Sequence, residues 1–356
     1  MTTTPAPTAK RLPGDIRRVL VMKWSAMGDV ALATCVMQDL VEALPGARFH
    51  LDTPPRFAAL FANDPRFERV LGIDVRQAGP GGMLRWLREV ARARYDAVVD
   101  LQSTDRSRLL LGLLTVLGRA PRVRIGNHRR WPYTVAPPAQ PREVHALEHL
   151  RATLRACGIV PAATTPVLHP GSEHEQRVAG LLREFALDSQ PFALFMPGCQ
   201  AAGWLKRWGW RRFAALAVAL TRRGIARVVL VGAEDERDEC DAIAAAIPDI
   251  AVNLCGRTQV LDVVALARAA RLVVANDTGT AHVAAVADRP MVVVCGPTDP
   301  RRVRPAGDSV RTCQAELHCI NCYLKTCTHH SCMQVLGAEQ VLAALEDAGA
   351  FDAARG

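Results

Sequence analysis

The chain has 356 residues, of which 49% are hydrophobic and 22% charged, and this length predicts two domains that each bury a core. The composition excludes a disordered or fibrous protein, and an aromatic content of 5% argues against an all-β sandwich and against base-stacking RNA modules. The net charge of +9 predicts an anionic partner: nucleic acid, a phosphate-bearing small molecule or an anionic membrane surface.

Hydropathy predicts no membrane span and no secretory signal. The strongest apolar run, Leu109–Gly118, is about half the length of roughly 20 residues that a span needs. The first fifteen residues are rich in Thr, Pro and Ala and lack the apolar stretch of a secretory signal. We therefore expect a cytoplasmic protein in which the eleven cysteines are reduced thiols or metal ligands.

The first half of the chain predicts alternating strands and helices. Short β-branched runs alternate with longer segments rich in Ala, Leu and Arg, a pattern typical of parallel α/β layers. The predicted strands are Arg18–Lys23, Arg48–Asp52, Arg69–Ile73, Ala97–Leu101 and Val123–Ile125. The predicted helices between or after them are Leu32–Leu44, Gly82–Ala93 and Leu147–Cys157.

A second series of elements follows a segment rich in Pro, Thr and Gly. Its predicted strands are Phe192–Met196, Arg227–Val231, Ala251–Leu254, Leu272–Ala275 and Met291–Val294. Its predicted helices are Phe213–Arg222, Glu236–Ala246, Leu261–Ala269 and Ala281–Ala287. We expect a flexible arm over residues 1–16, a domain over 17–160, a linker over 161–172 and a second domain over 173–356 with a cysteine-rich tail at 313–332. Both domains are predicted to be doubly wound α/β sheets facing a cleft, with ligands at the carboxyl ends of the strands.

The first candidate site follows the first predicted strand, at Trp24-Ser25-Ala26-Met27-Gly28-Asp29. Gly28 permits a tight turn from strand to helix, and Asp29 falls in the first helical turn. The Asp29 carboxylate either complements the helix dipole or acts in the cleft as a general base. No G-x-G-x-x-G occurs at this turn and no Walker motif occurs in the chain, so neither a dinucleotide site nor a P-loop is predicted.

Two loops of the second half carry groups suited to a diphosphate. Lys206-Arg207-Trp208 follows the strand ending in Met196-Pro197-Gly198, and its cations either neutralise a diphosphate or form a solvated basic loop. Asn276-Asp277-Thr278-Gly279-Thr280-Ala281-His282 joins a strand to a helix whose free N–H groups attract phosphate. Asp277 suits sugar hydroxyls, although Asp and Thr are also ordinary helix caps.

The tail combines cysteine with histidine. Cys319 and Cys322 form a C-x-x-C pair, followed by Cys327 and Cys332. The other spacings match no standard zinc finger. The four residues are candidate ligands of a structural, non-catalytic metal, and reduced structural thiols or a redox pair are the alternatives.

Taken together, these segments resemble the glycosyltransferase family 9 heptosyltransferases. The resemblance covers roughly Arg18 to Leu345 and is most specific in the segment 276–282 and in Gly296-Pro297-Thr298-Asp299-Pro300. Pro197-Gly198 with Lys206-Arg207-Trp208 is most similar to the heptosyltransferase II branch. The sequence departs from the family at Ala26, where a second serine is usual, and at Trp24, where a smaller residue is usual.

The resemblance implies a GT-B fold and inverting transfer of a heptose from ADP-heptose to the lipopolysaccharide inner core. It implies Asp29 as the base and Lys206 as a catalytic contact to the donor phosphate. The other donor-binding candidates are Glu236, Asp277, Thr278, Gly279, Thr280 and His282, and the acceptor-binding candidates are Ser25 and Gly28. No cofactor is expected for catalysis.

The expected partners are ADP-heptose, an anionic lipopolysaccharide-core acceptor and the inner membrane, met peripherally at its cytoplasmic face. No nucleic acid is expected, because no nucleic-acid motif occurs and the arginines are scattered. Two other functions fit the same scaffold: a nucleotide-sugar epimerase and a non-catalytic sugar-nucleotide-binding protein.

Overall fold

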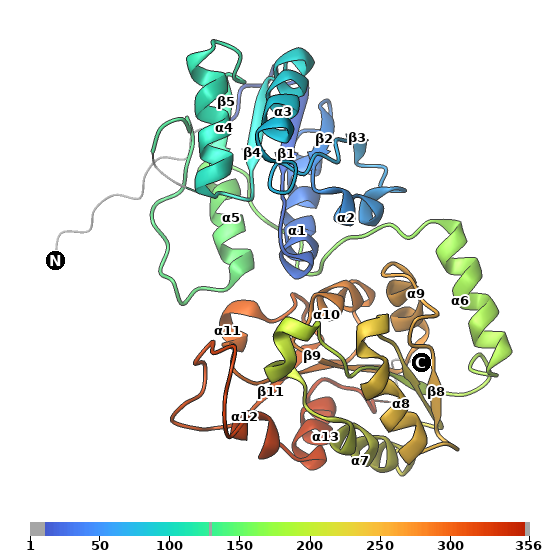
Figure 1. Cartoon of the computed structure of the whole chain (residues 1–356). Helices are drawn as coiled ribbons and strands as arrows, with labels where there is room; N and C mark the ends of the chain where they lie inside the picture. The colour runs from blue at the N-terminus through green and yellow to red at the C-terminus, as the bar shows by residue number, and fades with distance from the viewer. Residues whose placement is uncertain (1–10, 128–129, 353–356) are drawn as a thin grey trace. The chain divides into compact units, whose positions relative to one another are not determined.

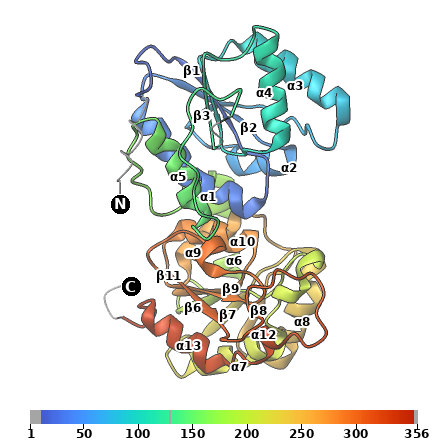
Figure 2. The same cartoon turned by 90° about the vertical axis from the view of Figure 1, so that its left-hand side faces the viewer.

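The protein divides into two compact units, seen in two views of the computed structural model in Figures 1 and 2. The structure describes residues 11–127 and 130–352, so most of the predicted N-terminal arm lies outside the described residues. The first unit comprises Met1–Ala163 and Val167–His169, and the second comprises Thr164–Pro166 and Pro170–Gly356. No helix of the described ranges combines the length and the apolar character that a membrane span requires.

The first unit is built on a five-stranded sheet with the order β3-β2-β1-β4-β5. All its strand pairs are parallel, with Arg18 opposite Arg48 between β1 and β2 and Val19 opposite Ala97 between β1 and β4. The strand order reverses between β1 and β4, so the loops after these two strands flank the point where such sheets bind ligands. The strands are β1 (Arg18–Met22), β2 (Arg48–Asp52), β3 (Phe67–Val70), β4 (Ala97–Asp100) and β5 (Val123–Gly126).

Helices cover both faces of this sheet, as right-handed crossovers between parallel strands require. Trp86 of α3 and Leu110 of α4 pack with Leu20 and Met22 of β1 in one core, while α1 packs against α5. The helices are α1 (Met27–Ala43), α2 (Pro55–Ala58), the 3₁₀ turn η1 (Ala59–Phe61), α3 (Gly79–Ala93), α4 (Asp105–Val116) and α5 (Ala146–Ala156). α4 is not among the predicted helices, and α1 begins at Met27 rather than at the predicted Leu32.

The second unit is built on a six-stranded parallel sheet with the order β11-β10-β9-β6-β7-β8. Here the order reverses between β6 and β9, where Ala193 lies opposite Leu272. The predicted strands are all present within one residue at each end, and β11 is an addition. The strands are β6 (Phe192–Met196), β7 (Arg227–Leu230), β8 (Ala251–Asn253), β9 (Leu272–Asn276), β10 (Met291–Cys295) and β11 (Val310–Gln314).

Its core lies between the sheet and α7, α8 and α13. Phe213 of α7, Ile243 of α8 and Val341 of α13 are fully buried with Phe195 of β6, while α9 packs with α6 and α10. The helices are α6 (Ser172–Glu184), η2 (Ala201–Lys206), α7 (Trp210–Thr221), η3 (Glu234–Glu236), α8 (Arg237–Ala246), α9 (Asp262–Ala269), α10 (Gly279–Ala284), η4 (Ala285–Ala287), α11 (Pro300–Val303), α12 (Ser331–Gln334) and α13 (Ala338–Asp347).

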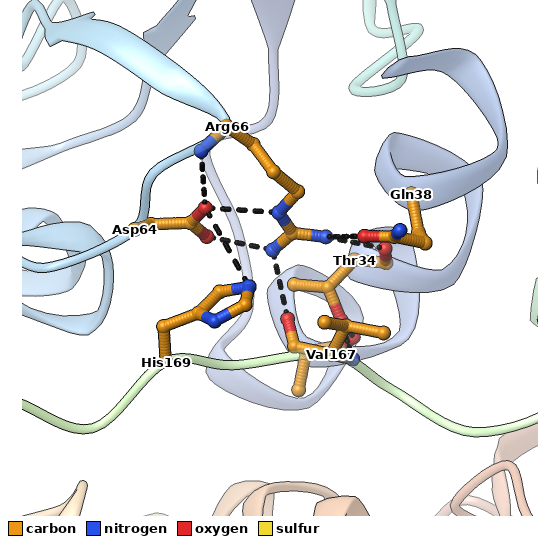
Figure 3. A network of polar contacts seen from close by, with 7 residues as sticks. Thr34, Gln38, Asp64, Arg66, Val167 and His169 are labelled. Atoms are coloured by element: carbon orange, nitrogen blue, oxygen red, sulfur yellow. Dashed lines mark hydrogen bonds and ion pairs between the residues drawn. The ribbon is translucent and has the colours of Figure 1, made fainter. Parts of the chain in front are cut away.

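A buried arginine anchors the segment Val167–His169 to the first unit (Figure 3). Arg66 forms a bidentate ion pair with Asp64 at 2.6 and 2.9 Å and donates to the carbonyl oxygen of Val167 at 2.9 Å. Thr34 of α1 accepts the N–H of Val167 at 2.8 Å. Because these groups are buried, each bond offsets a desolvation cost, and together they fix where the chain leaves the first unit.

Candidate active site

The loop after β1 presents Asp29 at the start of α1. Asp29 is exposed in the first helical turn, and its Oδ2 accepts the N–H of Ala26 at 3.1 Å. Ala26 precedes the helix and has no side-chain acceptor, so the Asp29 carboxylate serves as the cap. Asp29 therefore lies in the first helical turn, where it complements the helix dipole as one of the two interpretations expects, and this position leaves its carboxylate exposed to solvent.

Gln102, which follows β4, holds the loop that carries Ser25. Its Oε1 accepts the N–H groups of Trp24 and Ser25 at 2.9 and 3.2 Å, and its Nε2 donates to Ser25 Oγ at 3.1 Å. Gly28 is buried in the first turn of α1 and carries no side chain. Of the two candidate acceptor contacts, Ser25 is thus the one with an accessible side chain.

A pocket of about 320 Å³ lies beside Trp24, Ser25 and Gln102 in the first unit. Three arginines line it, and the carboxylate of Asp74 lies 3.5 Å from one of them, Arg56. A cavity of this size and charge suits a small anionic group such as a phosphate or an acidic sugar. The arginines are Arg56, Arg76 and Arg106, which the sequence analysis missed because they come from three separate loops and helices.

A buried carboxylate, Asp52, forms a hydrogen bond with Trp24, the tryptophan that lines this pocket. Asp52 ends β2, is completely buried, and accepts the indole N–H groups of Trp24 and Trp86 on Oδ2 at 2.8 and 2.6 Å. Its Oδ1 has no hydrogen-bond partner within the described part of the chain. Burial raises the pKa of Asp52 to about 7, against the opposing effect of the two indoles. Asp52 does not line the pocket itself, and it positions Trp24 through this hydrogen bond.

Asp52→Asn is expected to flatten the pH dependence of stability. The folded state binds the Asp52 proton more tightly than the unfolded state does, so the free energy of unfolding should fall as the pH rises from about 4 to about 7, by up to a few kcal/mol. Asn keeps an oxygen for both indoles and carries no charge. Urea unfolding of both proteins between about pH 5 and pH 7 checks this, and parallel slopes would contradict it.

In the second unit, Lys206 and Asp277 meet at the carboxyl ends of the central strands. Lys206 ends η2, and its Nζ lies 2.7 Å from Oδ2 of Asp277, the residue after β9. Thr298 donates to the same oxygen at 2.7 Å. Asn276 fixes the arrangement, because its side chain accepts the N–H of Trp208 and donates to the carbonyl oxygen of Pro197.

The candidate phosphate loop begins α10. Thr278 caps the helix by accepting the N–H of Ala281 at 3.3 Å, and Gly279 and Thr280 form its partly exposed first turn. His282 is only 6% exposed within the helix, so it offers little surface to a ligand. The helix expected after this loop is present, and the N–H groups of its first turn stay candidates for contact with an anion.

Glu236 lies over two glycines at neighbouring strand ends. A Cβ on Gly198 after β6 would collide with the Glu236 side chain, and one on Gly232 after β7 would lie 3.0 Å from its Oε2. The carboxylate accepts the N–H of Ala233 at 2.8 Å, and burial raises its pKa. Both glycines therefore let Glu236 lie against the strand ends at the ligand-binding edge of the sheet.

The cysteine tail gives no support to a metal site. No three His, Cys, Asp or Glu side chains within residues 11–127 and 130–352 are arranged to hold a metal ion. Cys319, Cys322 and Cys327 lie in the loop before α12, and Cys332 lies in α12. Burial, with the neighbouring thiols, raises the pKa of Cys332. The predicted structural metal is therefore unsupported.

Comparison with known proteins identifies the family. The family model "Glycosyltransferase family 9 (heptosyltransferase)" matches residues 83–333. The chain is 27% identical to lipopolysaccharide heptosyltransferase 1 of Pseudomonas aeruginosa, with 88% of each chain covered. It is also 27% identical to lipopolysaccharide heptosyltransferase 2 of Salmonella typhimurium, over 83% of this chain and 87% of that protein.

Two solved structures share the fold. A glycosyl transferase of family 9 from Veillonella parvula has a TM-score of 0.76 at 20% identity and covers 97% of this chain and 99% of its own. The ADP-heptose lps heptosyltransferase II of E. coli has a TM-score of 0.71 at 22% identity, over 93% and 98%. The predicted GT-B architecture of two parallel α/β sheets is confirmed. The chain belongs to glycosyltransferase family 9, the heptosyltransferases.

Proposed function

We propose that this enzyme transfers a heptose from ADP-heptose to an anionic acceptor in the lipopolysaccharide inner core, with inversion at the anomeric carbon. Its membership of family 9 and the names of its relatives support heptose as the transferred sugar and lipopolysaccharide synthesis as the pathway. The observation that carries the proposal is the pair of half-sites. The first unit has an exposed carboxylate, Asp29, four residues after Ser25, which lines the arginine-bearing pocket, and the second unit has a cation and a helix N-terminus.

In this proposal the first unit binds the acceptor and the second binds the donor. Asp29 removes the proton from an acceptor hydroxyl, whose oxygen forms a bond to the anomeric carbon of the heptose. The bond from that carbon to the diphosphate breaks on the opposite face, and its electron pair leaves with ADP. Lys206 and the N–H groups around Thr278–Thr280 stabilise the negative charge that develops on the diphosphate.

The remaining candidates bind and orient the donor and the acceptor. Asp277 and Glu236 suit hydroxyl groups of the heptose and the ribose, since a carboxylate directed at phosphate would repel it. Ser25 suits a hydroxyl of the acceptor, and the three pocket arginines suit its acidic groups. His282 is buried within α10, so in this proposal it supports the helix rather than contacting the donor.

No step of this proposal uses a metal ion or a cofactor, because a protein cation and backbone N–H groups supply the charge stabilisation. We therefore expect dialysis against a chelator to leave the rate of heptose transfer unchanged. A loss that a divalent cation restores would contradict this expectation. Metal analysis of the protein before dialysis provides the control for a bound ion that resists removal.

The proposed site of action is the cytoplasmic face of the inner membrane, because the acceptor carries a lipid. Mass spectrometry of the lipopolysaccharide core from a strain lacking this gene tests the function. We expect a core truncated at a heptose, restored by the wild-type gene. A full-length core in that strain would contradict the proposal, as would an ADP-heptose conversion that proceeds without any acceptor, which is the behaviour of an epimerase.

A further inference from the structure

Helix α4 carries apolar side chains on the side that faces away from the core. Leu110, Leu111 and Leu114 are buried against the sheet of the first unit. The exposed side chains recur every three or four residues and so form one stripe along the helix. Their exposed fractions are 54% for Leu109, 38% for Leu113, 77% for Val116 and 64% for Leu117.

Trp131 extends this stripe. Its side chain is 62% exposed, and its ring lies on the helix, since a Cβ on Gly112 would be 2.7 Å from it. Trp131 and Leu109 also line one hollow together with Arg108, Arg130 and Asp105, the last of which pairs with Arg108. A single exposed leucine is ordinary, whereas a contiguous apolar surface marks an interaction site. We call Leu109, Leu113, Val116, Leu117 and Trp131 the α4 face.

Positive charge surrounds the α4 face. Between Asp105 and Glu143 the chain contains eight arginines and no acidic residue. Of these, Arg106, Arg119 and Arg130 are exposed and form no ion pair with any described residue. Helix α3, which lies beside α4 in both views of the molecule (Figures 1 and 2), adds further exposed cations. These are Arg85, Arg88 and Arg92.

We propose that the α4 face docks on an anionic lipid bilayer, with its leucines and Trp131 in the interface and the surrounding arginines on the phosphate headgroups. Apolar side chains with an interfacial tryptophan and a basic rim are the features that hold peripheral proteins on anionic membranes. A second copy of this chain is a poorer occupant, because a two-fold contact would bring the same arginines of both copies together. The inference rests on the proposed function, which places the acceptor in a membrane.

Vesicle sedimentation of the full chain tests the proposal without any substrate. Wild-type protein should sediment with vesicles of phosphatidylethanolamine and phosphatidylglycerol and remain in solution with vesicles of phosphatidylcholine alone. Leu113→Asp/Leu117→Asp should lower binding to the anionic vesicles at least about tenfold. Arg119→Glu/Arg130→Glu should lower it similarly and reduce its dependence on salt.

Matched variants in the second unit control for charge and exposure. Val218→Asp/Val260→Asp replaces two side chains of 41% and 40% exposure, and Arg222→Glu reverses one exposed charge. Both should bind anionic vesicles as the wild type does. All variants should retain wild-type transfer to a delipidated, water-soluble acceptor, which shows that they fold.

Equal vesicle binding by Leu113→Asp/Leu117→Asp and wild type would overturn the proposal. A wild-type dimer in solution that this variant dissociates would also overturn it and assign the α4 face to a second copy. If the wild type binds vesicles but transfers no heptose to the soluble acceptor, the proposed function fails while the docking surface stands.

Discussion

Asp29→Asn is expected to lower the rate of heptose transfer by about 10²–10⁴-fold, the range typical of a lost general base. Binding of ADP should be unchanged, because Asp29 belongs to the first unit and the candidate donor loop to the second. Activity with saturating donor and isothermal titration with ADP measure the two effects separately.

The choice of Asn separates catalysis from capping. Asp29 accepts the N–H of Ala26, and an amide oxygen can accept that bond as well, so the stability of α1 should be retained. Asp29→Ala loses the acceptor too and should cost about 1 kcal/mol of stability. Asp105→Asn, at the first turn of α4, is the matched control and should transfer normally to a soluble acceptor. Near wild-type turnover by Asp29→Asn would leave Asp29 with the capping role alone.

Lys206→Met is expected to lower kcat/KM for the donor by about 10²–10³-fold, as the loss of one preorganised contact to developing charge does. The substitution also removes the ion-pair partner of Asp277, whose side chain is only 6% exposed. An uncompensated buried carboxylate destabilises the fold, so a loss of activity by this variant alone has two explanations.

The double variant Lys206→Met/Asp277→Asn, compared with Asp277→Asn alone, separates the two explanations. It removes the buried charge together with its partner, so the free energy of unfolding should recover while transfer stays low. Lys325→Met, in the exposed tail, is the matched control and should behave as the wild type. Wild-type transfer by Lys206→Met would remove this residue from the mechanism, and activity that recovers with stability in the double variant would make its role structural.

The strands were predictable because buried parallel strands are short, β-branched and continuous in the sequence. β2 and β6 have the predicted bounds, while β3 begins at Phe67 rather than Arg69 because it pairs with β2 from Phe49 onward. The start of α1 was predicted late, since Ala26 gives no capping signal and the cap comes from Asp29 behind it.

Helix α4 was not predicted from the sequence, because both of its sides are apolar. Leu110, Leu111 and Leu114 face the core and Leu109 and Leu113 face outward, so the run Leu109–Gly118 has no helical periodicity. The apolar side chains on the outer side of α4 removed its helical periodicity, and they are also what makes that side a candidate docking surface.

The sequence allowed each loop of the candidate site to be predicted separately. It did not predict which side chains of different loops contact each other. Lys206 and Asp277 are 71 residues apart in the chain and meet because β6 and β9 are neighbours at the switch point of the sheet. Trp86 and Asp52 are 34 residues apart, and nothing local in the sequence links an indole of α3 to a carboxylate at the end of β2. Such contacts depend on tertiary packing, which periodicity does not encode.

The reaction itself is tested most directly by incubating the purified enzyme with ADP-heptose and a heptose-deficient inner-core acceptor, and by determining the anomeric configuration of the product. We expect one heptosylated acceptor for each ADP released, with the configuration of the new bond inverted relative to the donor. Retention of configuration, or release of ADP without a heptosylated product, would contradict direct displacement assisted by Asp29.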